Sequence, residues 1–143
     1  MKLKKFLKQQ GYQPIVLTTL PSGHHLLSAK LNGKKGNFIL DTGASTTCID
    51  EAKIEKFKIK AKDTEHKATG AGSNDIDIQF SKKNKLKIGD WQIKKLPLVV
   101  MDLGHINEVL SMFDIEVDGI IGSDVLHDGK GIIQYEKELL FLK

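Results

Sequence analysis

Short apolar runs separated by turn-forming residues are the feature that most restricts the fold of this chain. The pair Asn32-Gly33 lies between two such runs, Leu26–Leu31 and Asn37–Leu40, and it is a strong signal for a tight β-hairpin. A second turn signal, Gly89-Asp90, separates two further runs of strand character. This pattern predicts an all-β chain that forms a small barrel.

Two segments have helical spacing, and one closing segment reads as a hairpin. Apolar residues recur on one helix face in Met1–Gln10, among lysines, and again in Ile106–Phe113. The last segment, Ile132–Leu142, is expected to form a terminal β-hairpin. We therefore divide the chain into an amphipathic extension, residues 1–14, and a single barrel domain, residues 15–143.

Composition excludes several classes of protein. The 143 residues are 40% hydrophobic and 28% charged, values that fit one soluble domain rather than a collagen-like or disordered chain. The lone cysteine, Cys48, excludes an internal disulfide and a cysteine-rich zinc site, and we interpret it as a buried structural thiol. No apolar run approaches the ~18 residues of a membrane span. The amino terminus lacks the apolar stretch of a secretory signal, so we expect a cytoplasmic protein.

The basic residues of this chain are all lysines. There are 22 of them against 18 acidic residues, for a net charge of +4. Without arginine forks for phosphate or guanine, we interpret them as a solvated surface and expect no specific nucleic-acid partner. The adjacent His24 and His25 would point to opposite faces of a strand, and the other histidines are scattered. We therefore expect no metal site.

The segment Phe38–Leu40 is an apolar run that ends in a carboxylate, Asp41. Thr42 and Gly43 follow, then small residues. An acidic group at the end of an apolar strand needs a tight turn with hydrogen-bond donors to receive it, and glycine allows close approach of backbone or ligand. These three residues taken alone fit an activated carboxylate or an ordinary turn.

Two later segments distinguish these possibilities. A small, glycine-rich segment, Ala68–Asn74, lies between strand-like sequences, and Ile120-Ile121-Gly122 follows some eighty residues after Asp41. In combination with Asp41-Thr42-Gly43-Ala44-Ser45, these segments resemble the retropepsin-like aspartic peptidase family, and its bacterial members more than its viral ones. The resemblance covers roughly residues 15–143 and implies a closed acid-protease barrel with short accessory helices.

The resemblance also implies a role for each motif residue. The catalytic aspartate would be Asp41. The rest of the active-site loop would be Thr42, Gly43, Ala44 and Ser45. A flap closing over substrate would contain Ala68, Thr69, Gly70, Ala71, Gly72 and Ser73, although a surface hairpin without a lid function fits the same residues. The segment packed beneath the loop would be Ile120, Ile121 and Gly122. We interpret Asp124 as a helix-start residue rather than a second catalytic acid.

Aspartic peptidase chemistry requires two carboxylates, and this chain has one Asp-Thr-Gly motif. The resemblance therefore implies a homodimer that hydrolyses a peptide or protein substrate and needs no cofactor. Retroviral members carry a salt bridge at the positions of Ser45 and Ser123, and both charged partners are absent here. A catalytically silent peptide-binding module of the same fold is the alternative interpretation.

Overall fold

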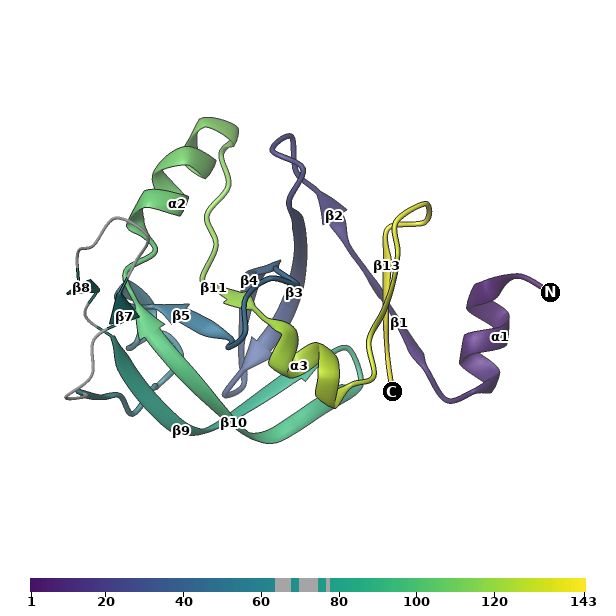
Figure 1. Cartoon of the computed structure of the whole chain (residues 1–143), viewed down its shortest axis with the longest axis horizontal. Coiled ribbons are helices and arrows are strands. Elements are labelled where there is room, and N and C mark those ends of the chain that lie inside the picture. The colour runs from purple at the N-terminus through teal and green to yellow at the C-terminus, as the bar shows by residue number, and fades with distance from the viewer. Residues whose placement is uncertain (64–67, 70–74, 77) are drawn as a thin grey trace.

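The computed structural model describes residues 1–63, 68–69, 75–76 and 78–143, and it is mostly β-structure (Figure 1). The helices are short: α1 (Leu3–Gln9), α2 (Gly104–Leu110), α3 (Ser123–Asp128) and the 3-10 turns η1 (Glu51–Lys53) and η2 (Ser111–Phe113). The strands before the middle of the chain are β1 (Gln13–Val16), β2 (Thr18–Thr19), β3 (His25–Leu31), β4 (Lys34–Leu40), β5 (Cys48–Asp50) and β6 (Lys62–Asp63). The later strands are β7 (Ala68–Thr69), β8 (Asp75–Ile76), β9 (Gln79–Ile88), β10 (Trp91–Met101), β11 (Gly119–Ile121), β12 (Ile132–Gln134) and β13 (Leu139–Leu142).

Six strands form a closed ring in the order β3-β4-β11-β5-β10-β9, and the pairing of β9 with β3 closes it. The pairs β4–β11 and β5–β10 are parallel, whereas the other pairs in the ring are antiparallel. The prediction of an all-β closed barrel with short accessory helices is therefore confirmed. Both predicted helical segments also contain helix, at α1 and at α2 with η2.

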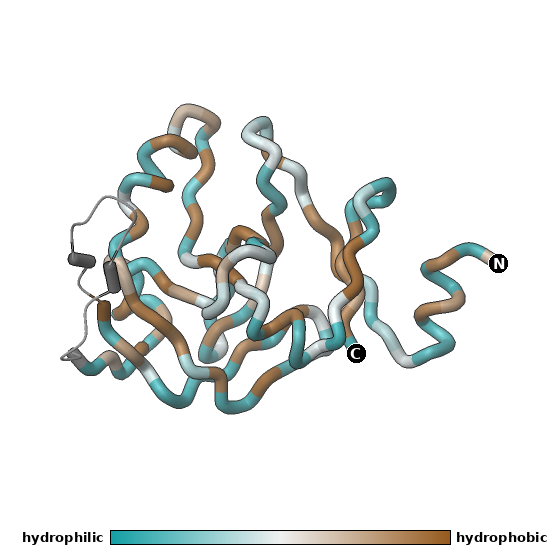
Figure 2. The backbone as a smooth tube through the Cα atoms, viewed as in Figure 1, coloured by the Kyte–Doolittle hydropathy of each residue, from teal (hydrophilic) through white to brown (hydrophobic). Residues whose placement is uncertain are grey.

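The inside of the ring is filled by apolar side chains. Along β3 the residues Leu27, Ala29 and Leu31 are buried while those between them are exposed, the alternation of a strand with one face on a core. Phe38 and Phe57 are fully buried, with ring centroids 6.2 Å apart. Hydrophobic stretches follow the strands of the ring (Figure 2). Burial of these side chains supplies the main driving force for folding.

The predicted hairpin at Asn32-Gly33 connects β3 to β4 and also helps to close the barrel. Both residues have positive φ, 50° and 84°, as the tight hairpin turn requires. The Asn32 side-chain amide donates to Phe57 O (2.9 Å) and Asn84 Oδ1 (3.0 Å), and its oxygen accepts from Lys85 N (2.9 Å). The turn is thus joined to β9, the strand whose pairing with β3 closes the ring.

The two ends of the chain form a separate three-stranded sheet, β1-β13-β12. It includes the predicted terminal hairpin, which is confirmed as β12 and β13. Helix α1 lies beyond this sheet, away from the ring (Figure 1), and Leu7 is its one buried residue. The division of the chain at residue 15 and the cytoplasmic location stay predictions. In the described part of the chain, the helices are all too short or too polar to cross a membrane.

Candidate active site

Asp41 is the first residue after β4, at the point where the chain leaves the barrel wall. Its N–H donates to Ile121 O (2.9 Å), which continues the pairing of Leu40 with Ile121 between β4 and β11. The carboxylate oxygen Oδ1 accepts the N–H of Gly43 (2.9 Å), and the side chain is otherwise exposed to solvent. The strand and turn therefore fix the base of the side chain and leave its carboxylate accessible.

Gly43 and Thr42 complete the turn. A Cβ on Gly43 would lie 3.3 Å from Asp41 Oδ1, so glycine leaves room for the carboxylate to turn back onto the main chain. Thr42 is exposed, and its hydroxyl has no hydrogen-bond partner among the residues that the structure describes. The role of Thr42 in the active-site loop stays a prediction.

The predicted supporting segment lies directly against the Asp41 loop. β11 contains Ile120 and Ile121 and runs between β4 and β5. A Cβ on Gly122 would lie 2.6 Å from Ala44 O, closer than real Cβ atoms approach other atoms, and 3.1 Å from the carbonyl carbon of Thr46, which is also a tight contact. The Ser123 N–H then donates to the same Ala44 O (2.7 Å). Next to Ser45 and at Ser123, the two positions of the retroviral salt bridge, the loop is therefore held by main-chain contact.

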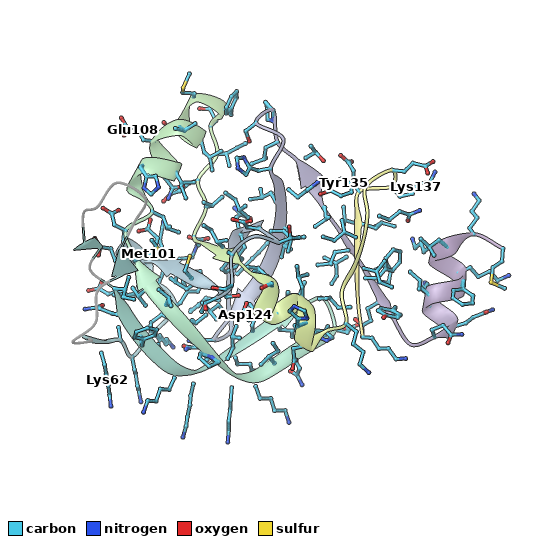
Figure 3. The ribbon with its side chains drawn as sticks, in the orientation of Figure 1. Lys62, Met101, Glu108, Asp124, Tyr135 and Lys137 are labelled. Carbon is cyan, nitrogen blue, oxygen red and sulfur yellow. The ribbon has the colours of Figure 1, made fainter. Side chains whose placement is uncertain are left out.

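A second set of hydrogen bonds holds the loop where it enters β5. Asp124 accepts from Thr47 N (3.0 Å) and Thr47 Oγ1 (2.7 Å), while Thr47 Oγ1 also accepts the Gly122 N–H (3.1 Å). Figure 3 shows Asp124 in α3, near the centre of the molecule. The sequence indicated Asp124 as a helix-start residue, which its contact with Val125 N (2.9 Å) fits. Its contact with Thr47, 77 residues away, was missed because no local signal marks it.

A pocket of about 200 Å³ opens beside Asp41. Three parts of the chain meet there: the turn between β2 and β3, the end of β4, and the β12–β13 hairpin. The residues that line it are Gly23, His24, His25, Leu40, Asp41, Thr42, Ile133 and Tyr135. A neighbouring hollow of about 320 Å³ shares Thr42 with it and is lined further by residues of α3 and the segment after it.

The expectation that His24 and His25 point to opposite faces of a strand is wrong. β3 begins at His25, so His24 is still part of the turn, and Gly23 before it has φ 89°. Both histidines line the same pocket as Asp41. The turn signal at Pro21-Ser22-Gly23 was the available clue that the strand starts late. Within the described ranges, no three His, Cys, Asp or Glu side chains gather as a metal site would require.

The predicted flap is described only at its base. Ala68 and Thr69 form β7, which pairs antiparallel with β8 in the register Ala68 with Ile76 and Thr69 with Asp75. Gly70, Ala71, Gly72, Ser73 and Asn74 lie outside the described residues. Their role as a flap stays a prediction.

Cys48 is buried at the start of β5, close to the Asp41 loop. Burial is the main reason that the pKa of its thiol is raised to about 11, and the nearby carboxylates of Asp124, Asp41 and Asp50 act in the same direction. A hydrogen bond with the Ile120 main chain lowers the pKa by less. The thiolate needed for nucleophilic attack is therefore scarce at neutral pH.

We expect Cys48 to resist alkylation by iodoacetamide in the folded protein at about pH 7.5 and to react readily in denaturant. The raised pKa and the burial both act against reaction in the native state. Intact-mass measurement over time gives both rates. Labelling of the native protein as fast as that of the denatured protein would contradict the burial of this thiol.

Comparison with known proteins agrees with this geometry. The sequence pattern of the aspartyl protease family matches residues 27–125, which include the Asp41 loop, β11 and the start of α3. The match covers more than half of the chain, and the chain belongs to this family. Comparison with curated proteins finds no match.

Solved structures with a similar fold are retropepsin-like. A retropepsin-like aspartic protease from Rickettsia conorii has 23% identity and a TM-score of 0.60, over 92% of this chain and 91% of that chain. EIAV protease, in complex with the inhibitor HBY-793, has 22% identity and a TM-score of 0.55, over 78% of this chain and 92% of that chain. The retroviral protease-like domain of Ddi1 from Leishmania major has 15% identity and a TM-score of 0.58, over 82% of this chain and 86% of that chain. The predicted retropepsin-like fold is thereby confirmed.

Proposed function

We propose that this chain is a homodimeric aspartic endopeptidase in which the two copies of Asp41 activate water against a peptide bond. The observation that carries the proposal is the exposed Asp41 carboxylate, on a turn held by Gly122 and Ser123, in the wall of a pocket. Membership of the aspartyl protease family supports the same assignment.

The chemistry requires a second carboxylate close to the first. Two carboxyl groups in contact share one proton because both cannot ionise, so one serves as base and the other as acid. The base takes a proton from water as that water attacks the carbonyl, and the acid protonates or hydrogen-bonds the carbonyl oxygen. The chain has a single Asp-Thr-Gly motif, so the second Asp41 would come from another copy across a twofold axis.

The edge strand β12 supports a partner beside Asp41. In the described part of the chain, β12 pairs with β13 alone, and its other edge lacks the charge or proline that usually protects an open edge. Ile133 of this strand lines the Asp41 pocket. Gln134 has a buried side-chain oxygen without a hydrogen-bond donor among the described residues. A second β12 along this edge would place the partner's chain next to Asp41.

Cleavage of a diverse peptide library, from acidic to neutral pH, tests the proposal. We expect the wild-type chain to cleave and Asp41→Asn to lose activity by about 1,000-fold or more, because both acid and base functions depend on this carboxyl. Because Asp41 is exposed, the melting temperature of Asp41→Asn should equal that of the wild-type chain. Rate per chain should rise with concentration over the range in which light scattering shows the dimer forming.

Two outcomes would contradict the proposal in different ways. A stable dimer that binds peptides but cleaves none at any pH would favour the catalytically silent binding module. Activity that persists in Asp41→Asn would remove Asp41 from the mechanism. The matched control is Asp90→Asn, which changes an exposed carboxyl in the β9–β10 turn and should leave cleavage unchanged.

A further inference from the structure

The pocket beside Asp41 contains two imidazoles whose orientation is set by neighbouring hydroxyl groups. His24 Nδ1 lies 2.7 Å from Ser22 Oγ, and His25 Nδ1 lies 3.3 Å from Thr19 Oγ1. The His25 ring also meets the Tyr135 ring edge-on, with centroids 5.1 Å apart and planes at 61°. Figure 3 shows Tyr135 at the β12–β13 hairpin, on the side that faces β2 and β3.

These contacts leave one nitrogen of each ring for a ligand. With Nδ1 engaged by a hydroxyl, Nε2 of His24 and of His25 has no hydrogen-bond partner among the residues that the structure describes. The rest of the wall combines apolar residues, Leu40 and Ile133, with the polar residues Asp41, Thr42 and Tyr135. In a binding pocket, precisely placed polar groups fix the orientation of the ligand and provide specificity.

We propose that this pocket binds a carboxylate side chain of the peptide substrate, so that the enzyme selects Asp or Glu within two residues of the scissile bond. The inference rests on the proposed function, since the pocket shares Asp41 and Thr42 with the proposed catalytic loop. Protonated imidazoles donate charge-assisted hydrogen bonds to a carboxylate, and these are stronger than bonds between neutral groups. An extended peptide places alternate side chains on one side, so one side chain can enter while the main chain passes Asp41.

The preference for a carboxylate side chain is expected to depend on pH, because the pocket residues that bind it can gain or lose a proton. The selection requires a protonated imidazole and an ionised substrate carboxylate, and histidine is the side chain that changes charge in mildly acidic to neutral solution. The other titratable groups in the pocket wall are Asp41 and Tyr135. The charged residues of the hairpin turn, Glu136, Lys137 and Glu138, are exposed and do not line the pocket; His127 and Lys130 line the neighbouring hollow. Preference for the carboxylate is therefore expected to be greater in mildly acidic than in mildly alkaline solution.

The test compares two peptides that differ by Glu or Gln at one position, chosen from those that the wild-type enzyme cleaves. At pH ~5.5 we expect kcat/KM to favour the Glu peptide by roughly tenfold, the size of one charge-assisted hydrogen bond. His24→Gln and His25→Gln should each reduce this ratio toward one. His105→Gln, on the exposed face of α2, is the matched control and should keep the full ratio.

A binding measurement separates failure of this inference from failure of the proposed function. Fluorescence anisotropy of both labelled peptides with Asp41→Asn reports selection without turnover. Tighter binding of the Glu peptide, lost in the double variants with His24→Gln or His25→Gln, supports the pocket even if no cleavage is found. Equal binding and equal cleavage of the two peptides at pH ~5.5 would overturn the pocket assignment while the peptidase assignment stands. Tyr135→Phe keeps the ring against His25 and should keep the preference for the Glu peptide, and the melting temperature of each histidine variant shows whether it is folded.

Discussion

Mixing the wild-type chain with a roughly ninefold excess of Asp41→Asn is expected to lower cleavage per wild-type chain about tenfold, because only about a tenth of the wild-type chains would then have a wild-type partner. The reason is the shared proton: a dimer with one Asp and one Asn has no pair of carboxyls to act as base and acid. The chains must be given time to exchange partners, and the rate is measured on the same peptide before and after exchange.

The control for this mixing experiment is Asp90→Asn at the same excess. Asp90 is an exposed carboxyl in the β9–β10 turn, so this variant should form active mixed dimers. Cleavage per chain that carries Asp41 should then stay constant. If Asp41→Asn also leaves the rate per wild-type chain unchanged after exchange, each chain works alone and the shared active site is excluded.

Features set by neighbouring residues could be predicted from this sequence. The Asn32-Gly33 turn needs two positive φ angles, which these residue types tolerate, and the structure has φ 50° and 84° there. The apolar alternation of β3 and the small residues after Asp41 are equally local signals. Each of these features depends on residues that lie within a few positions of one another, so the pattern alone was sufficient.

Features set by pairing between distant segments could not be predicted in this way. The ring closes through Leu31 with Leu86, and the parallel pairs join β4 to β11 and β5 to β10. A strand pattern states which face is buried but not which strand lies alongside. The same limit explains why two contacts could not be predicted: the hydrogen bond between Thr47 and Asp124, and the ring contact between His25 and Tyr135. In each pair the two residues lie far apart in the sequence.

Where retroviral members carry a salt bridge, this chain has other contacts. The resemblance places that salt bridge, at the positions of Ser45 and Ser123, near the dimer contact; here the Ser123 N–H donates to Ala44 O (2.7 Å) and Asp124 accepts from Thr47. Loss of both charged partners together leaves no buried charge without a partner. The loop is therefore held by main-chain contact at Gly122 and Ser123 together with the hydrogen bonds between Asp124 and Thr47.

This explanation predicts that Gly122→Ala abolishes most of the activity. The new Cβ would lie 2.6 Å from Ala44 O and 3.1 Å from the Thr46 carbonyl carbon, and both are backbone atoms that cannot rotate away. The Asp41 loop must therefore move outward, and the Ser123 contact with Ala44 would be broken or lengthened. Displacement of a catalytic group by about 1 Å can cost about 100-fold in rate, and overpacking of this kind costs about 1–3 kcal/mol of stability.

Measurement of kcat/KM together with the melting temperature distinguishes a displaced loop from a chain that does not fold. We expect a folded Gly122→Ala protein with a lower melting temperature and cleavage reduced by about 100-fold. Gly104→Ala is the matched control, because its Cβ would approach only the side chain of Asp102 (2.9 Å), which is exposed and can rotate. That variant should keep full activity. If Gly122→Ala folds and cleaves like the wild type, close packing beneath the loop does not position Asp41, and the role of Ile120-Ile121-Gly122 as its support would have to be abandoned.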